Sequence, residues 1–165
     1  MLIKDSLKLM NEVIKTEYSD GTIYTLNGKY HRIDGPAIEY KDGTKYWYFN
    51  GFRHRENGPA IESADGEKHW FLNGNRHREN GPAIEFTNGS KEWYLHGKLH
   101  REDGPAVVLG NGNKYWFLNG VCHREDGPAI ECADGTKQYW VNGERLDFIT
   151  SDQMLIYYLK YDFLK

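Results

Sequence analysis

The heptapeptide HREDGPA stands at residues 100–106 and again at 123–129, and close copies stand at 31–37 (HRIDGPA), 54–60 (HRENGPA) and 77–83 (HRENGPA). The histidines that open the copies are 23 residues apart throughout, and a proline and a lysine recur at the same step. A fixed period of this length is typical of supersecondary units that bury their apolar surface against their neighbours. The heptapeptide therefore indicates a structural repeat in the first place, and a catalytic motif only second.

A single repeat, PAIEYKDGTKYWYFNGFRHRENG at 36–58, contains two dipeptides that favour tight hairpin turns. Asp42-Gly43 and Asn50-Gly51 each suit a two-residue turn in which both central residues have positive φ. The residues between them, 44–49, are rich in aromatics, as strands commonly are. The repeat is therefore predicted to be a β-hairpin followed by a second turn.

The turn length predicts the pairing register of the hairpin. A two-residue turn at 42–43 places Ile38 opposite Trp47 and Glu39 opposite Tyr46, and the second turn places His54 opposite Trp47. Because side chains alternate between the two faces of a strand, Ile38, Trp47 and His54 are expected to share one face. The isoleucine and tryptophan positions of successive repeats would then form the core.

The predicted fold is mainly β, an array of antiparallel β-hairpin repeats over 17–146 that forms an elongated ribbon or solenoid. The open ends of such an array need covering. At the N-terminus, Leu7, Met10 and Ile14 fall near helical spacing, and Ser151 is a candidate N-cap near the other end. Short capping helices are therefore predicted over 1–16 and 147–165.

Bulk composition excludes several classes of protein. The 165 residues suffice for one domain, and the net charge of −3 gives no basic excess, so nucleic acid is an unlikely partner. No apolar run approaches the roughly 20 residues of a membrane span. The two cysteines make no disulfide framework and are expected to be free thiols. With no signal peptide recognised at the start, the expected location is cytoplasmic.

The repeat resembles the MORN family of 23-residue β-hairpin repeats. The resemblance rests on segments such as Asp42-Gly43-Thr44-Lys45-Tyr46 and Asn50-Gly51-Phe52-Arg53-His54, and covers roughly 19–143. Arginine follows the histidine where MORN units usually have glycine, and x-W-(Y/F) replaces Y-x-G. The G-P-A segment resembles repeats of uncharacterised phage and giant-virus proteins. The resemblance implies an interaction module with protein partners, dimerisation or lipid contact, and carries over no catalytic residues.

The His–Arg–acid signature has a structural and a chemical interpretation. Histidines on successive repeats would lie about 10 Å apart by strand spacing, too far to share a zinc ion. An enzyme needs one asymmetric site, which five equivalent copies argue against. The histidine is therefore predicted to pack on tryptophan and bond loop backbone, and the arginine to pair with an acid. No catalytic residue, metal ligand or cofactor is predicted.

A second aromatic ladder is predicted on the face opposite Trp47, at Tyr48, Phe71, Tyr94, Phe117 and Trp140. It is either an exposed binding stripe or the second half of the core, and the sequence leaves both open. Positions 46 and 53 vary between repeats, which favours them for recognition. The predicted partner-binding residues are Tyr46, Tyr48, Arg53, Phe71, Arg76, Tyr94, Leu99, Val108, Tyr115 and Phe117.

Together these observations predict a non-enzymatic, repeat-built protein-binding module, an adaptor or inhibitor of the phage-encoded kind that the resemblance suggests. Formation of a homodimer stays open. The alternative is a protein that sequesters a small anionic ligand such as a nucleotide, with arginines and aromatics supplying its pocket. Exposed Arg53 and Arg76 would favour an acidic partner or an anion at this face.

Overall fold

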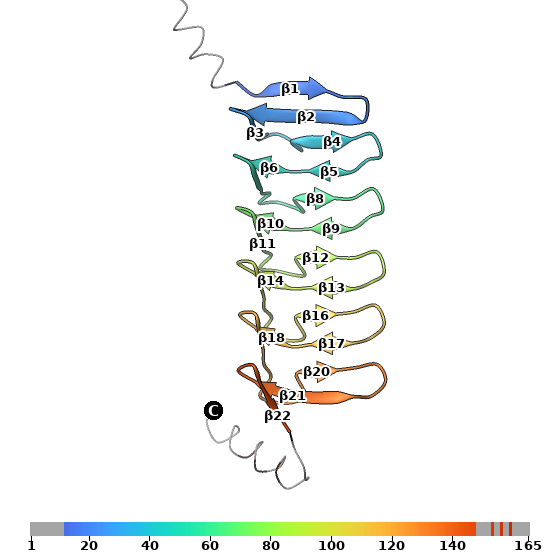
Figure 1. Ribbon diagram of the computed structural model, residues 1–165, viewed down its shortest axis with the longest axis vertical. Coiled ribbons are helices and arrows are strands. Elements are labelled where there is room, and N and C mark those ends of the chain that lie inside the picture. Colours follow the sequence, from blue (N-terminus) through green and yellow to red (C-terminus); the bar gives the residue numbers. More distant parts are fainter. Residues whose placement is uncertain (1–11, 148–152, 154–155, 157–158, 160–165) are drawn as a thin grey trace, which may run out of the picture. The chain divides into compact units, whose positions relative to one another are not determined.

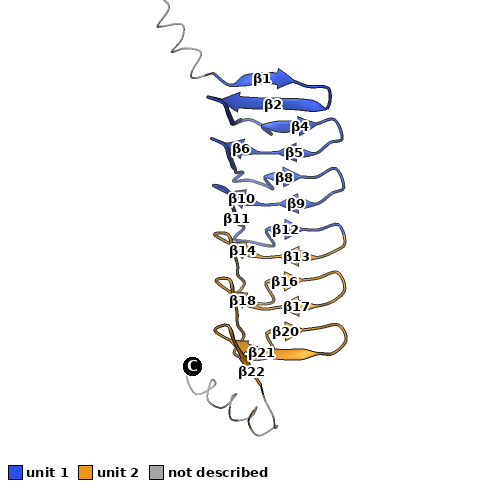
Figure 2. Ribbon diagram, viewed as in Figure 1, with its two compact units in different colours: residues 1–87 blue, residues 88–165 orange. Residues whose placement is uncertain are grey.

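The fold is built from short antiparallel β-hairpins, as Figure 1 shows. This computed structural model describes residues 12–147, 153, 156 and 159. The chain divides into two compact units, residues 1–87 and 88–165 (Figure 2). In each unit the predicted mainly β class, with hairpins repeated along an antiparallel sheet, is confirmed.

The first unit contains an antiparallel sheet in the order β1-β2-β4-β5-β8-β9-β12, with β3 paired to β2. Its strands are β1 (Ile14–Glu17), β2 (Gly21–Leu26), β3 (Lys29–Tyr30), β4 (Ile38–Tyr40), β5 (Lys45–Tyr46), β8 (Ile61–Glu62), β9 (Lys68–His69) and β12 (Ile84–Glu85). Two small hairpins branch from it, β6 (Tyr48–Phe49) with β7 (Phe52–Arg53) and β10 (Phe71–Leu72) with β11 (Asn75–Arg76).

The second unit repeats this plan in the order β13-β16-β17-β20-β21-β22. Its sheet consists of β13 (Lys91–Glu92), β16 (Val107–Val108), β17 (Lys114–Tyr115), β20 (Ile130–Glu131), β21 (Lys137–Val141) and β22 (Glu144–Leu146). Its small hairpins are β14 (Tyr94–Leu95) with β15 (Lys98–Leu99) and β18 (Phe117–Leu118) with β19 (Val121–Cys122).

The Asn-Gly turn adopts the predicted two-residue form. Asn50 and Gly51 have φ of 50° and 87°, and Tyr48 pairs with Arg53 across the turn. Positive φ at both positions is the signature of a type I′ turn, which asparagine and glycine tolerate best. His54 donates its backbone N–H to the Trp47 carbonyl at 3.1 Å, so the predicted pairing of these two residues is confirmed.

The Asp-Gly turn differs from its prediction by one residue. Only Gly43 has positive φ, at 95°, and Tyr40 bonds to Thr44 across a three-residue loop. The Asp42 side chain accepts the Thr44 N–H at 2.8 Å, which holds the aspartate in a type I turn and leaves the left-handed position to glycine alone. Such a loop adds one residue to the strand connection.

The added residue shifts the cross-strand pairs of each hairpin that this turn closes. Ile38 lies opposite Tyr46, and Glu39 opposite Lys45, so the predicted pairing of Ile38 with Trp47 is wrong. Tyr46 also lies opposite Ile61 in the next hairpin. Positions 46 and 69 therefore stand in one row with the isoleucines. The next row alternates lysine with glutamate, a favourable cross-strand arrangement of opposite charges.

The core lies where the row of isoleucines meets the small hairpins. The alanine of each G-P-A segment is fully buried, at positions 37, 60, 83, 106 and 129. Phe71 is 8% exposed and packs with Ala60 and Ile61, and Tyr46 and Trp47 lie against this cluster. The second aromatic ladder is thus core at Phe71 and half-buried at its other positions, Tyr48, Tyr94, Phe117 and Trp140.

The predicted N-terminal helix is wrong where the chain can be described. Ile14–Glu17 form β1, which pairs along its whole length with β2, from Ile14 opposite Thr25 to Glu17 opposite Thr22. Residues 1–11 lie outside the described residues. Of the predicted C-terminal helix, Gln153, Ile156 and Leu159 have helical backbone, but the residues among them lie outside the described part. That helix stays a prediction.

Replacement of Ile84 by alanine should lower the free energy of unfolding by about 2–5 kcal/mol, because Ile84 is only 1% exposed and its loss leaves a cavity. Ile33→Ala is the matched control. Ile33 is 82% exposed, so the change should stay within about 0.5 kcal/mol. Urea unfolding measures both values, and equal effects of the two changes would contradict the assignment of the core.

Candidate functional site

The arginine of each heptapeptide lies over an aromatic ring from the segment that precedes its loop. The guanidinium carbon of Arg55 is 3.8 Å from the ring centre of Trp47, and Arg78 stands in the same way over Trp70. Arg101 and Arg124 cover Trp93 and Trp116 at 4.3 and 4.2 Å, and Arg32 covers Tyr24 at 4.1 Å. The arginine, rather than the histidine as predicted, is therefore the group shown packing on tryptophan.

Hydrogen bonds fix each arginine over its ring. Arg55 Nη1 donates to the Pro59 carbonyl at 3.0 Å and to Glu62 Oε1 at 2.7 Å. Where aspartate follows two residues later, Arg Nε also donates to it, as Arg101 does to Asp103 at 2.8 Å. The predicted pairing of arginine with an acid is confirmed. The loop is therefore tied to the sheet through one side chain.

The histidine joins neighbouring repeats. His54 Nδ1 accepts the backbone N–H of Asn73 at 3.2 Å, and His123 Nδ1 accepts that of Asn142 at 3.1 Å. These donors belong to the Asn-Gly turn of the following repeat. The predicted bond between histidine and loop backbone is confirmed. His54 Nδ1 also lies 2.9 Å from the side-chain Oδ1 of Asn73.

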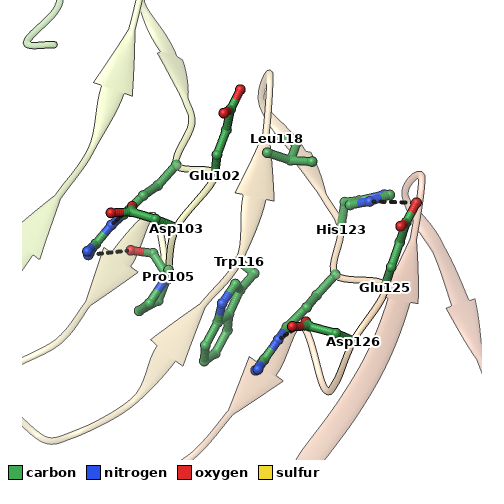
Figure 3. A pocket seen from close by; sticks show the side chains of 11 residues that line it. Glu102, Asp103, Pro105, Trp116, Leu118, His123, Glu125 and Asp126 are labelled. Carbon is green, nitrogen blue, oxygen red and sulfur yellow. Dashed lines mark hydrogen bonds and ion pairs between the residues drawn. The ribbon is translucent and has the colours of Figure 1, made fainter. Parts of the chain in front are cut away.

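Open clefts lie between successive heptapeptide loops. One has a volume of about 610 Å³ and is lined by Trp116 and Leu118, with the loop of Glu102 and Asp103 on one side and that of Glu125 and Asp126 on the other (Figure 3). In the first unit, two equivalent clefts surround Trp70 and Trp47, with volumes of about 660 and 730 Å³. The same sequence motif thus builds the same concave surface several times.

The chemistry of these clefts is that of carboxylates and stacked guanidinium groups. Asp34 and Asp103 are ionised side chains whose pKa the neighbouring arginine holds below its usual value. Among the described residues, no group of three or more His, Cys, Asp or Glu is arranged to hold a metal ion. The free Cys122 thiol has a pKa raised to about 11 by burial, so it is protonated and a weak nucleophile at neutral pH.

The predicted partner-binding residues occupy three different environments. Arg53 and Arg76 are exposed on β7 and β11, and Phe71 is buried in the core. Tyr46 and Tyr115 stand within the main sheets, opposite Ile61 and Ile130. The others are half-buried, namely Tyr48, Tyr94, Leu99, Val108 and Phe117. The aromatic rings of this set do not form an open stripe in either unit.

The cleft around Trp47 has an apolar lining that sequence reasoning missed. Ile33 and Phe49 line it, and they are 82% and 42% exposed. Ile33 occupies the position that is Glu56, Glu79, Glu102 or Glu125 in the other repeats, and Phe49 the position that is Leu72, Leu95, Leu118 or Val141. The signal was present in the sequence as two further departures from the repeat, at positions 33 and 49.

Comparison with known proteins identifies no relative, since neither a protein-family description nor a curated protein sequence matches the chain. In the part of the chain that is described, no helix combines the length and the apolar character that crossing a membrane requires.

Arg55→Lys should lower the free energy of unfolding by about 1–2 kcal/mol, because lysine keeps the charge but loses the guanidinium contact with the Trp47 ring and the Nη1 hydrogen bonds to Pro59 and Glu62. Arg53→Lys in the same repeat is the control and should change it by less than about 0.5 kcal/mol. Arg53 is exposed, and its guanidinium carbon is 5.5 Å from the centre of the Phe71 ring, farther than Arg55 is from Trp47. Thermal and urea unfolding measure the difference, and indistinguishable variants would refute the role given to the stack.

Acidification below pH 6.5 should destabilise the wild type more than His69→Tyr. Burial holds the pKa of His69 below its ordinary value of 6.5, so in this range the unfolded chain binds more protons than the folded one. The contribution of neutral His69 is therefore complete above pH 6.5 and is lost as the pH falls. Tyrosine is a matched replacement because Tyr46 and Tyr115 fill the same position. Parallel stability curves from pH 7.5 to 5 would contradict this assignment.

Proposed function

We propose that the chain is a non-enzymatic protein-binding module of MORN-like hairpin repeats. The observation that carries the proposal is the open cleft around Trp47, where Ile33 and Phe49 expose apolar surface beside charged rims. Exposed apolar side chains that gather in a concave site are typical of recognition surfaces. Phe52, 59% exposed and paired with Phe49 across the β6–β7 turn, extends this surface.

The repeated construction supports binding over catalysis. The clefts around Trp47, Trp70 and Trp116 share their arginine, tryptophan and loop framework and differ only in a few lining side chains. A scaffold of this kind keeps its backbone while single positions change to suit a partner. The MORN-like motif suggests the same role, as an adaptor or an inhibitor, and the phage-like G-P-A segment suggests a phage origin. The free cysteines fit a cytoplasmic location.

Sequestration of a small anion is the weaker proposal. The arginines of the clefts are already engaged with aromatic rings and with Glu62, Glu85 or Asp103. The side chains that project furthest from the rims are carboxylates, among them Asp34 and Glu102, at 82% and 85% exposure. An anionic ligand such as a nucleotide would be repelled by these groups.

Two faces compete as the recognition surface. The sequence-based choice centres on Tyr48 and Arg53, which lie opposite each other across the β6–β7 hairpin. Phe49 and Phe52 form the next pair and therefore point to the other side of that hairpin. We place the partner at the Phe49 side, because the Tyr48 position is half-buried in its repeat and its equivalent Phe71 is core.

The experiment is affinity capture from a cell lysate with the immobilised full chain, followed by calorimetric titration of the purified captured protein. Ile33→Glu combined with Phe49→Leu should abolish or weaken binding at least about tenfold, because it removes the exposed apolar anchors. Both new residues occur naturally at these positions of other repeats, so the fold should persist in circular dichroism. Arg53→Glu combined with Arg76→Glu should bind within about threefold of the wild type.

If the Arg53→Glu, Arg76→Glu variant loses binding and the Ile33→Glu, Phe49→Leu variant keeps it, the recognition surface is the Arg53 face. Full binding by both double variants would contradict both locations. The absence of saturable binding for every captured protein would contradict the proposed function itself.

A further inference from the structure

The cleft around Trp47 combines an apolar wall with a carboxylate on each rim. Ile33 stands on the loop at 31–36 and Glu56 on the loop at 54–59, with Phe49 between them. In the equivalent cleft around Trp116, glutamates stand on both loops and Leu118 replaces the phenylalanine. The first cleft therefore differs from its counterpart by isoleucine in place of one glutamate, by Asn57 in place of one aspartate, and by a ring in place of leucine.

The Phe49 side of the apolar wall is held in place before any partner arrives. The Phe49 ring lies 4.8 Å from the ring of His31 and 5.8 Å from that of His54. His31 is itself buried and bonded through Nδ1 to the Asn50 backbone N–H at 3.1 Å. Arg55 covers the other boundary of the cleft from above Trp47. A wall fixed by its neighbours loses little conformational entropy when a ligand binds.

The exposed charges on the rims of the cleft are carboxylates. The lining carries two guanidinium groups, those of Arg32 and Arg55, and two carboxylates, those of Asp34 and Glu56. Arg32 approaches Asp34 at 2.9 Å and Glu39 at 3.7 Å, and Arg55 approaches Glu62 at 2.7 Å. Glu56 lies 3.9 Å from His54 Nε2. Asp34 and Glu56 are the more accessible groups, at 82% and 77% side-chain exposure, whereas both arginines are largely covered by their rings.

We propose that this cleft binds an extended peptide segment of a partner protein in which a bulky apolar side chain is flanked by lysine or arginine. The apolar side chain packs against Ile33 and Phe49, and the flanking cations reach Asp34 and Glu56. This chemistry rests on the proposed protein-binding function and specifies its partner. The rim carboxylates disfavour an anionic lipid surface, which would otherwise suit an exposed aromatic group.

The test uses three synthetic peptides, GSKKWKKSG, GSEEWEESG and GSKKAKKSG, titrated into the isotopically labelled full chain and followed by NMR. The lysine-flanked tryptophan peptide should shift the resonances of Ile33 and Phe49. Exchange of its lysines for glutamates, or of its tryptophan for alanine, should weaken binding about tenfold or more. A higher salt concentration should weaken the binding of the lysine-flanked tryptophan peptide, since the rim charges are exposed to solvent.

Two variants locate the site. Ile33→Glu with Phe49→Leu should remove the shifts, because it converts the first cleft to the lining of the others. Glu102→Ile with Leu118→Phe is the transplant, and it should give the cleft around Trp116 a second, measurable site for the same peptide. Both variants use residues that the repeat already carries at these positions, and their folding is checked by circular dichroism.

Shifts confined to residues away from Ile33 and Phe49 would overturn the proposal, as would the lack of shifts. Equal or tighter binding of the glutamate-flanked peptide would overturn the charge preference. Neither result decides the proposed function, because the capture experiment with the full chain detects a protein partner at any face. Failure of that capture with retained peptide binding would leave the chemistry of the cleft supported and the physiological role refuted.

Discussion

A guanidinium group lying on an aromatic ring joins the two halves of each repeat. The tryptophan lies between the main-sheet strand and the small hairpin, as Trp47 does between β5 and β6. The arginine belongs to the loop that returns, so their contact fixes how far apart these two segments stand. Arg55, for example, reaches both the Pro59 carbonyl and Glu62 from its position over Trp47. The cleft beside each stack exists because the loop is held off the sheet at this fixed height.

The period and the hairpin architecture followed from sequence because they depend on short-range rules. Asn50 and Gly51 take positive φ as their residue types favour, and the turn position follows at once. The register of the other turn did not follow. Asp42 can serve two turn types, and the choice depends on a side-chain bond to Thr44 that sequence spacing does not reveal. One added residue then moved Tyr46 into the isoleucine row and disproved the predicted core pairing.

The candidate site was harder to predict than the fold. Histidine and arginine are adjacent in sequence, and only the bend of the loop decides that arginine covers the ring while histidine bonds the next Asn-Gly turn. Clefts arise from the spacing between loops, which no single repeat specifies. The predicted recognition positions, 46 and 53, leave out Ile33 and Phe49, where the lining of the cleft around Trp47 departs from the other repeats. The N-terminal segment shows a further limit, since Ile14, which falls near helical spacing, begins β1 and pairs with the longer strand β2.

The bond from histidine to the Asn-Gly turn of the following repeat has an evolutionary consequence. His54 with Asn73 in the first unit, and His123 with Asn142 in the second, use the same atoms at nearly the same distance. Because the bond joins the histidine of one repeat to the Asn-Gly turn of the next, any repeat that carries this turn can follow. Duplication or deletion of a whole repeat would therefore create no new kind of junction. Lineages can lengthen or shorten the row of clefts in one genetic step, and the residue at the position of Ile33 in each new copy is then free to diverge.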